Sequence, residues 1–294
     1  MYRDLIGKII IPVLLLAMLA SCSKAPDMTS ATTTTEVTTT ARSETATSET
    51  TTAPLPSDPE IKEESETVKR VVFYRDGNPV KAKVYLPEGE GPFKTVVIVG
   101  GMYIDLGYYS GKADIMNGNG YAVVEVSPSN NKLTGVYQLP EYMGDFVYEQ
   151  MQDLLYVMDE LKILPELDLS NVYLFGHSVG GLATVYAGEQ RQDEIKGMIL
   201  VEPSFQYPET MLFEKDQKLR TDLYPLLSEI KVPVLIVKGT GDRPDLEDFP
   251  HFYDKAVEAV PNAELVTIEG ADHPMRGEPG NEMARTVCQY IEKW

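Results

Sequence analysis

The sequence has few of the residues on which several classes of protein depend. Of its 294 residues, two are cysteines and three are histidines. Two cysteines exclude a disulfide-stapled scaffold and a cysteine-based zinc site. The three histidines are scattered, without an H-x-x-x-H pattern, and no phosphate-binding loop is present. We therefore expect neither a metal nor another cofactor.

Basic residues are also scarce. The 26 lysines and arginines oppose 45 acidic residues, which gives a formal net charge of −19 at pH 7. Because so acidic a surface repels phosphate backbones, nucleic acid is excluded as a partner. Hydrophobic residues make up 43% of the chain and charged residues 24%. This composition is typical of globular proteins and excludes a wholly disordered chain.

One long uncharged apolar run stands near the start of the chain. Arg3 and Lys8 precede the run Ile9–Ala20, which is too short to span a bilayer and is typical of a signal peptide. Residues 19–22 (LASC) resemble a bacterial lipobox, and the resemblance implies cleavage before Cys22 and lipidation of its sulfur. Several acyl chains would anchor the protein to the bacterial cell membrane, outside the cytoplasm. An ordinary secretory signal is the alternative.

The composition divides the chain into three segments. Residues 1–21 are the predicted signal peptide, and residues 22–67 are a predicted disordered tether that begins with the lipidated cysteine. Between Thr29 and Ser57 the chain is mostly Thr, Ser, Ala and Glu. Such a segment cannot bury enough surface to offset the entropy of ordering. Residues 68–294 remain, and they suffice for one domain with a single core.

The predicted domain begins with a hairpin and continues as alternating strands and helices. Two β-rich runs flank a turn at Asp76–Asn78. Short apolar runs then recur at helix-length intervals, and strands that are apolar on both faces are buried between helices in a parallel sheet. The pattern predicts an α/β fold with a mostly parallel sheet and helices on both faces. The runs are Thr95–Val99, Tyr121–Val126, Asn171–Phe175, Gly197–Val201, Val232–Val237 and Glu264–Ile268.

The segment 171–181 (NVYLFGHSVGG) carries the most specific motif. A predicted strand runs directly into G-x-S-x-G at residues 176–180, and a predicted helix follows. In this context a tight turn lifts the hydroxyl of Ser178 above the carboxyl edge of the sheet, where open α/β sheets bind their ligands. The alternative is a structural glycine-rich turn with a capping serine.

On this motif and its flanking elements, residues 68–294 resemble the α/β-hydrolase superfamily. The resemblance implies a triad in the order serine, acid, histidine. Its nucleophile would be Ser178, and its acid Asp242, in the loop after the strand Val232–Val237. Its base would be His273, in the sequence GADHP after the last predicted strand.

Other residues compete for two of these roles. Asp245 lies near Asp242, and Glu202 ends an earlier predicted strand, where some members of the superfamily carry the acid. His177 is adjacent to the serine, so its side chain is expected to point elsewhere and to be structural. His251 stands at the start of a predicted helix and is expected at the surface.

The resemblance also implies an oxyanion hole and a pocket. Two backbone N–H groups would stabilise the tetrahedral intermediate. Val179 follows from the elbow, and Met102 follows from the loop after the strand Thr95–Val99. That loop begins Gly-Gly where many members have His-Gly. Possible pocket residues are Tyr103, Phe205 and Tyr207, and a short cap insertion is expected at residues 206–231.

Together these features predict a membrane-anchored serine hydrolase outside the cytoplasm, which cleaves carboxylic esters through an acyl-enzyme on Ser178. Small or medium esters, including acyl groups on polysaccharides, are the expected substrates. One alternative is a serine aminopeptidase-type peptidase or another amide or thioester hydrolase. Another is a non-catalytic surface-binding lipoprotein that has kept the fold. The sequence leaves the oligomeric state open.

Overall fold

The computed structural model describes five parts of the chain, all within one compact unit. The predicted signal peptide, the lipidation site Cys22 and most of the tether lie outside these parts. No helix within them is both long enough and apolar enough to cross a bilayer. The described residues are 57–131, 143–204, 219, 223–241 and 249–294.

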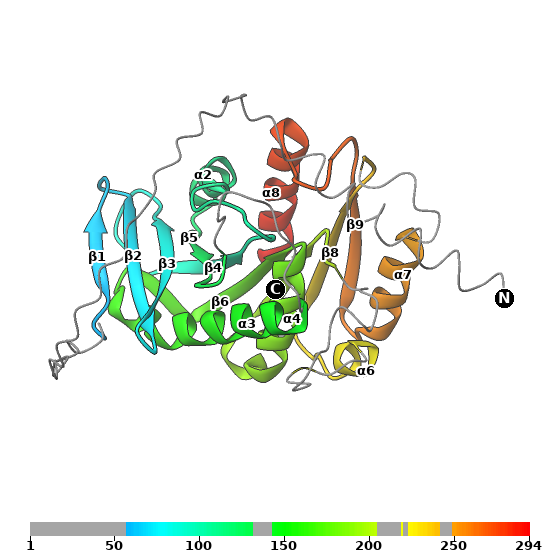
Figure 1. Ribbon diagram of the computed structural model, residues 1–294. Helices are drawn as coiled ribbons and strands as arrows, with labels where there is room; N and C mark the ends of the chain where they lie inside the picture. Colours follow the sequence, from blue (N-terminus) through cyan, green and yellow to red (C-terminus); the bar gives the residue numbers. More distant parts are fainter. Residues whose placement is uncertain (1–56, 132–142, 205–218, 220–222, 242–248) are drawn as a thin grey trace, which may run out of the picture. The chain divides into compact units, whose positions relative to one another are not determined.

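A nine-stranded sheet forms the centre of the molecule (Figure 1), in the order β1-β2-β3-β5-β4-β6-β7-β8-β9. The strands β1, β2, β3 and β5 pair antiparallel, and the pairs from β5 to β9 are parallel. This confirms the predicted sheet. The strands are β1 (Glu60–Glu63), β2 (Val68–Arg75), β3 (Asn78–Tyr85), β4 (Phe93–Val99), β5 (Ala122–Ser127), β6 (Leu167–His177), β7 (Gly197–Val201), β8 (Val234–Gly239) and β9 (Ala263–Ile268).

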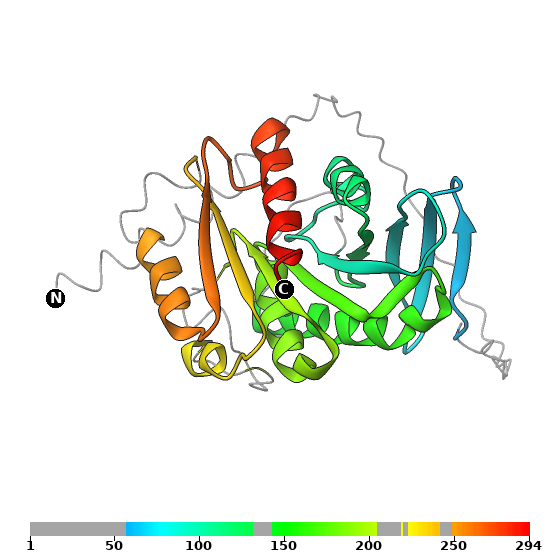
Figure 2. The ribbon, with the colours of Figure 1, turned by 180° about the vertical axis from the view of Figure 1, so that it is seen from behind.

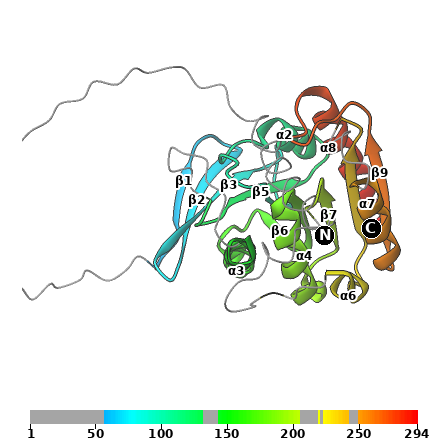
Figure 3. The ribbon, with the colours of Figure 1, turned by 45° about the vertical axis from the view of Figure 1, so that its right-hand side comes forward.

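Helices cover both faces of the sheet. The helices α2 and α8 pack together on one face, and α3, α4, α6 and α7 lie on the other. Figures 1 and 3 show the two layers, and Figure 2 shows α8, in red, from behind. The helices are α2 (Ser110–Gly118), α3 (Met143–Glu160), α4 (Val179–Gln190), α6 (Leu223–Ser228), α7 (Phe249–Ala259) and α8 (Gly277–Ile291), with 3-10 turns η1 (Leu161–Ile163) and η2 (Gln192–Glu194).

The strand β4 shows why the predicted strands are continuously apolar. Val97 and Val99 pack into the hydrophobic cluster under α3 and α4. Val96 and Ile98 pack into the cluster under α2 and α8. Successive side chains of a strand point to opposite faces, so a strand with a helix layer on each face buries every residue.

The first hairpin forms where the sequence predicts it. Asp76 and Gly77 have φ angles of 51° and 76°, and a two-residue turn with both central residues at positive φ matches the twist of the strands that it joins. The sheet itself begins earlier than expected. The strand β1 pairs with β2 from Glu60 onward, so the tether ends before residue 67. All four residues of β1 are exposed, and it therefore lacks the apolar alternation that reveals a strand.

Candidate active site

The turn between β6 and α4 holds Ser178 in an unusual backbone conformation. β6 ends at His177, α4 begins at Val179, and the serine between them has φ 56° and ψ −122°. Residues other than glycine rarely adopt a positive φ. Two backbone bonds support this turn: the N–H of Ser178 donates to the carbonyl of Val201 over 2.9 Å, and its carbonyl accepts from the N–H of Ser204 over 3.1 Å.

The glycines of the motif are required by close backbone contacts. A Cβ atom at Gly176 would lie 2.5 Å from the Cα atom of Gly181. At Gly180 it would lie 2.3 Å from the carbonyl oxygen of Gly100. Real Cβ atoms do not approach other heavy atoms so closely, so any side chain at these positions would push α4 away from β6 or β4.

His273 lies beside the serine. Its Nε2 atom is 2.9 Å from the Oγ atom of Ser178, which is hydrogen-bonding distance. The histidine reaches this place from the loop between β9 and α8, and the serine is 7% exposed. The structure thus brings together the two residues that the sequence names as nucleophile and base.

The side chain of His177 bonds to Tyr109 and to the loop of His273, and its ring centroid lies 5.5 Å from that of His273. Its Nε2 atom is 2.7 Å from the carbonyl oxygen of His273, and its Nδ1 atom is 2.7 Å from the hydroxyl of Tyr109. Because a carbonyl only accepts, the Nε2–H donates and Nδ1 accepts from the tyrosine. Burial, with smaller contributions from Tyr108 and Glu125, raises the pKa of Tyr109 well above its ordinary value, and its hydroxyl also bonds to the backbone of Gly101.

This chain of hydrogen bonds is a site feature that the sequence did not reveal. It joins the loop after β4, the elbow and the histidine loop. Tyr109 and His177 are 68 positions apart in the chain, and His177 and His273 are 96 positions apart. The sequence shows that His177 is adjacent to Ser178, but this adjacency does not identify the residues to which His177 bonds. His251, the remaining histidine, lies in α7.

The candidate acids Asp242 and Asp245 lie outside the described residues. The segment before them is bound to the histidine loop, because the N–H of Gly241 donates to the carbonyl of Ala271 over 2.9 Å. A Cβ atom at Gly239 would lie 2.2 Å from the same carbonyl oxygen. The backbone segment that precedes Asp242 and the segment that precedes His273 are therefore in direct contact.

Glu202, the third candidate acid, is fully buried at the end of β7, with φ 43°. One oxygen of its carboxylate accepts from the N–H of Gly239. The other accepts from the hydroxyl of Tyr253 in α7 over 2.7 Å. Both oxygens thus have partners other than His273, and they connect β8 to α7 on either side of residues 242–248.

The loop between β4 and α2 carries Met102 and lies against the serine. A Cβ atom at Gly101 would be 3.2 Å from the Cβ atom of Ser178. Val179, the other expected oxyanion donor, is buried at the first position of α4, where the N–H groups of a helix lack intrahelical partners. The two expected donors therefore belong to separate elements: Val179 directly follows Ser178, and Met102 directly follows Gly101, which contacts Ser178.

Glu125 in β5 holds the second half of this loop. Its carboxylate accepts from the N–H of Gly107 over 2.9 Å and from the hydroxyl of Tyr85 over 3.0 Å. Burial raises the pKa of Glu125, and these hydrogen bonds partly oppose that effect. The carboxylate thus fixes the chain that leads from Met102 into α2.

Of the three predicted pocket residues, Tyr103 lies in the described part of the chain. The ring of Tyr103 packs edge-on against the ring of Phe146 in α3, with 6.1 Å between ring centroids, and its φ is 58°. Phe205 and Tyr207 lie outside the described residues. So does most of the expected cap at 206–231, although α6 falls within it. Within the described residues no cluster of three or more potential metal ligands occurs.

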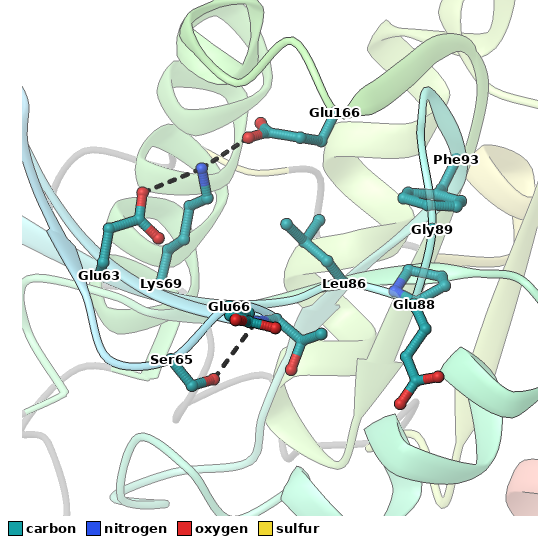
Figure 4. A pocket seen from close by; sticks show the side chains of 11 residues that line it. Glu63, Ser65, Glu66, Lys69, Leu86, Glu88, Gly89, Phe93 and Glu166 are labelled. Atoms are coloured by element: carbon teal, nitrogen blue, oxygen red, sulfur yellow. Dashed lines mark hydrogen bonds and ion pairs between the residues drawn. The ribbon is translucent and has the colours of Figure 1, made fainter.

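A polar cavity of about 940 Å³ lies at the other edge of the sheet (Figure 4). Phe93 at the start of β4 and Glu166 just before β6 line it, so it opens at the amino ends of the strands, whereas Ser178 follows a carboxyl end. Lys69 bridges Glu63 and Glu166 there, with N–O distances of 3.1 and 2.6 Å. This cavity is not part of the serine site.

Comparison with known proteins connects this geometry to hydrolases. Residues 90–226 match the family model described as serine aminopeptidase, S33. The match covers slightly less than half of the chain. No curated protein matches the sequence significantly.

Several solved structures share the fold. Est1E from Butyrivibrio proteoclasticus is 18% identical with a TM-score of 0.58, over 76% of this chain and 98% of that one; with ferulic acid bound the values are 19%, 0.57, 74% and 96%. A putative dipeptidyl aminopeptidase IV from Bacteroides ovatus is 18% identical with a TM-score of 0.58, over 80% of this chain and 36% of that one. FphF, a fluorophosphonate-binding serine hydrolase of Staphylococcus aureus, is 16% identical with a TM-score of 0.57, over 76% and 97%.

The chain therefore has the α/β-hydrolase fold, as the sequence predicts. In its fold, and in the family match over residues 90–226, it is similar to the serine hydrolases of that superfamily.

Proposed function

We propose that the protein is a serine hydrolase that cleaves carboxylic esters through an acyl-enzyme on Ser178. The observation that carries the proposal is the 2.9 Å contact between the Nε2 atom of His273 and the Oγ atom of Ser178, on a strained turn at the carboxyl edge of the sheet. A serine hydroxyl becomes a useful nucleophile only when a base within hydrogen-bond reach takes its proton.

The proposed mechanism combines the contact between His273 and Ser178 with the roles that the resemblance implies for Asp242, Val179 and Met102. His273 takes the proton as the Oγ atom of Ser178 attacks the ester carbonyl carbon, and Asp242 stabilises the resulting imidazolium. The N–H groups of Val179 and Met102 donate to the oxyanion. The intermediate collapses, the C–O bond to the alcohol breaks, and His273 returns the proton to the leaving oxygen. Water, activated by the same histidine, then releases the acid and restores the serine.

The two alternatives to an esterase are an aminopeptidase-type amide hydrolase and a non-catalytic binding protein. The family match to serine aminopeptidases and the likeness to a dipeptidyl aminopeptidase favour an amide substrate. Est1E with ferulic acid bound supports esters, with an aromatic acyl group among the candidates. A non-catalytic binding protein is disfavoured, because a strained serine in contact with a histidine costs stability without serving a binding surface.

The location is proposed from the sequence. The lipobox-like residues 19–22 would place a lipid on Cys22 and hold the hydrolase on the outer side of a bacterial membrane, beside small or polysaccharide-linked esters. Cys22→Ala would then release the protein from the membrane fraction. Retention of the variant in that fraction would contradict the lipid anchor, but it would not bear on the proposed hydrolase activity.

The test of activity uses the full-length chain in detergent and its Ser178→Ala variant. We expect turnover of p-nitrophenyl esters or methyl ferulate by the parent and a loss of about 10⁴-fold or more in the variant. A fluorophosphonate probe should label the parent only. Ser228→Ala is the matched control, because Ser228 is exposed and its hydroxyl donates to the carbonyl of Pro225 within α6.

The outcomes separate the candidates. Hydrolysis of aminoacyl p-nitroanilides but not of esters would favour the aminopeptidase. Ester turnover that survives in Ser178→Ala would contradict the acyl-enzyme. A parent that neither turns over a substrate nor reacts with the probe would favour the binding protein.

A further inference from the structure

The loop that carries Met102 follows an unusual path immediately after that residue. Tyr103 has a φ of 58°, a conformation that side chains of L-residues rarely adopt. An isolated loop would not keep it, so something outside the loop must hold the chain there.

The side chain of Asn131 supplies the support. Its Oδ1 atom accepts from the N–H of Tyr103 over 2.5 Å, and its Nδ2 atom donates to the carbonyl of Ile104 over 2.9 Å. One amide thus satisfies a backbone donor and a backbone acceptor on consecutive residues. An amide has both groups, whereas an ionised carboxylate has only acceptors.

Asn131 is itself held in place. Its N–H donates to the carbonyl of Pro128 over 3.0 Å. The neighbouring Ser129 donates from both its N–H and its hydroxyl to Asp153, over 2.6 and 2.7 Å. Asp153 is fully buried in α3 and also accepts from Arg75 in β2. Hydrogen bonds that lead to α3 and β2 therefore fix the segment that carries the Asn131 amide.

The peptide of Met102 lies between two fixed points. On one side Gly101 rests against Ser178, and on the other side Tyr103 is bonded to Asn131. Rotation of the Met102 N–H would have to displace one of these contacts. A donor that is already aimed at the developing oxyanion needs no reorganisation during the reaction, and this is the main source of its catalytic effect.

We propose that Asn131 is a positioning residue of the oxyanion hole, which holds the backbone at Tyr103 and Ile104 so that the N–H of Met102 faces the oxyanion. The inference rests on the proposed serine hydrolase. It assigns Asn131 a role in the transition state and none in the binding of the substrate.

The experiment measures how fast a fluorophosphonate probe labels the full-length chain in detergent, since the phosphoryl oxygen needs the same donors. In Asn131→Ala we expect the maximal labelling rate to fall about 10- to 10²-fold, less than for complete loss of a donor. The probe concentration for half-maximal rate should stay unchanged. Asn130→Ala is the matched control, because Asn130 donates to the carbonyl of Phe146 in α3 and not to this loop; its rate should stay close to that of the parent.

Each outcome decides. Labelling of Asn131→Ala at the parental rate would overturn the role of Asn131 and leave the serine hydrolase intact. An equal loss in Asn130→Ala, or a loss that appears only in the half-maximal concentration, would also overturn it. A parent that is not labelled at Ser178 would overturn the proposed function and this inference together.

If circular dichroism shows that Asn131→Ala does not fold, a second variant, Asn131→Asp, tests the proposal. Asn131→Asp keeps the size and the acceptor for Tyr103 but, when ionised, lacks the donor for Ile104. Its labelling rate should fall as well, and a parental rate would overturn the proposal.

Discussion

The two edges of the parallel sheet are built on different principles. At the carboxyl edge, four of the described residues other than glycine have a positive φ: Tyr103, Ser178, Glu202 and Met275. At the amino edge, the cavity is lined by charged side chains, and Lys69 forms ion pairs with Glu63 and Glu166.

The difference lies in what holds each edge. A residue in a sparsely populated conformation costs about 1–3 kcal/mol and persists only where its surroundings fix it. At the carboxyl edge hydrogen bonds do this: the N–H of Tyr103 donates to the side chain of Asn131, and the N–H of Gly239 donates to the carboxylate of Glu202. At the amino edge Glu63, whose side chain is 61% exposed, pairs with Lys69, and an ion pair with so exposed a partner contributes about 0–1 kcal/mol. We therefore expect loss of one hydrogen-bonding group to have a larger effect at the carboxyl edge than loss of Glu63 has at the amino edge.

Among the variants that compare the two edges, the largest effect is expected from the hydrogen-bond chain that ends on the carbonyl of His273. His177→Ala removes the donor to this carbonyl and frees the histidine loop, and a displacement of about 1 Å can lower a rate about 10²-fold. Turnover by the variant should fall by about this factor. Tyr109→Phe, which keeps the ring and loses only the hydroxyl, should show a smaller loss.

The measurement is kcat and KM on an ester that the parent hydrolyses, with circular dichroism to show that both variants fold. Equal activity of the parent and His177→Ala would mean that the loop of His273 holds its place without this contact, and the contrast between the edges would weaken.

A smaller effect, on stability, is expected at Glu125. Burial raises its pKa above the ordinary value of 4.5, so between 4.5 and that raised pKa the folded protein binds the proton more tightly than the unfolded chain. The free energy of unfolding then falls as pH rises through this window, by at most about 1.4 kcal/mol per pH unit. In Glu125→Gln this contribution is absent.

Urea unfolding of the parent and Glu125→Gln, at a series of pH values from 4 upward, measures the difference. Glu258→Gln, which changes an exposed carboxylate in α7, is the control and should follow the parent. A difference between the parent and Glu125→Gln that does not vary with pH would contradict the raised pKa.

The smallest effect is expected at the amino edge. Glu63 has a side chain that is 61% exposed and lies 3.1 Å from Lys69. Because its ion pair is solvated, Glu63→Gln should change the free energy of unfolding by no more than about 0.5 kcal/mol. Its ester turnover should equal that of the parent. A clear loss of turnover would show that the amino edge is coupled to the serine.

The sequence predicts the fold well where the signal is local. The strands β4 to β8 are buried on both faces and read as apolar runs, and the motif around Ser178 stands between a strand and a helix that the sequence also shows. The sequence does not reveal the strand β1, because β1 pairs through its backbone and exposes all its side chains.

The supports of the site could not be predicted in the same way. His177 acts through Tyr109 and the carbonyl of His273, which no spacing rule connects. Asn131 holds a loop 27 and 28 residues before it, and a lone asparagine in a connecting segment has no distinguishing pattern. The assignment of Asp242 as the acid stays a prediction, since that residue lies outside the described parts of the chain.

The close contact at Gly180 has a consequence for how the protein acquires its activity. The backbone oxygens that a Cβ atom there would meet belong to Val99 and Gly100, at the end of β4 and some eighty residues earlier in the chain. The elbow is thus completed only when β4 has paired with β6, a long-range step that is slow compared with helix formation. In refolding, the return of catalysis should follow the docking of the central strands and lag behind the recovery of helical structure.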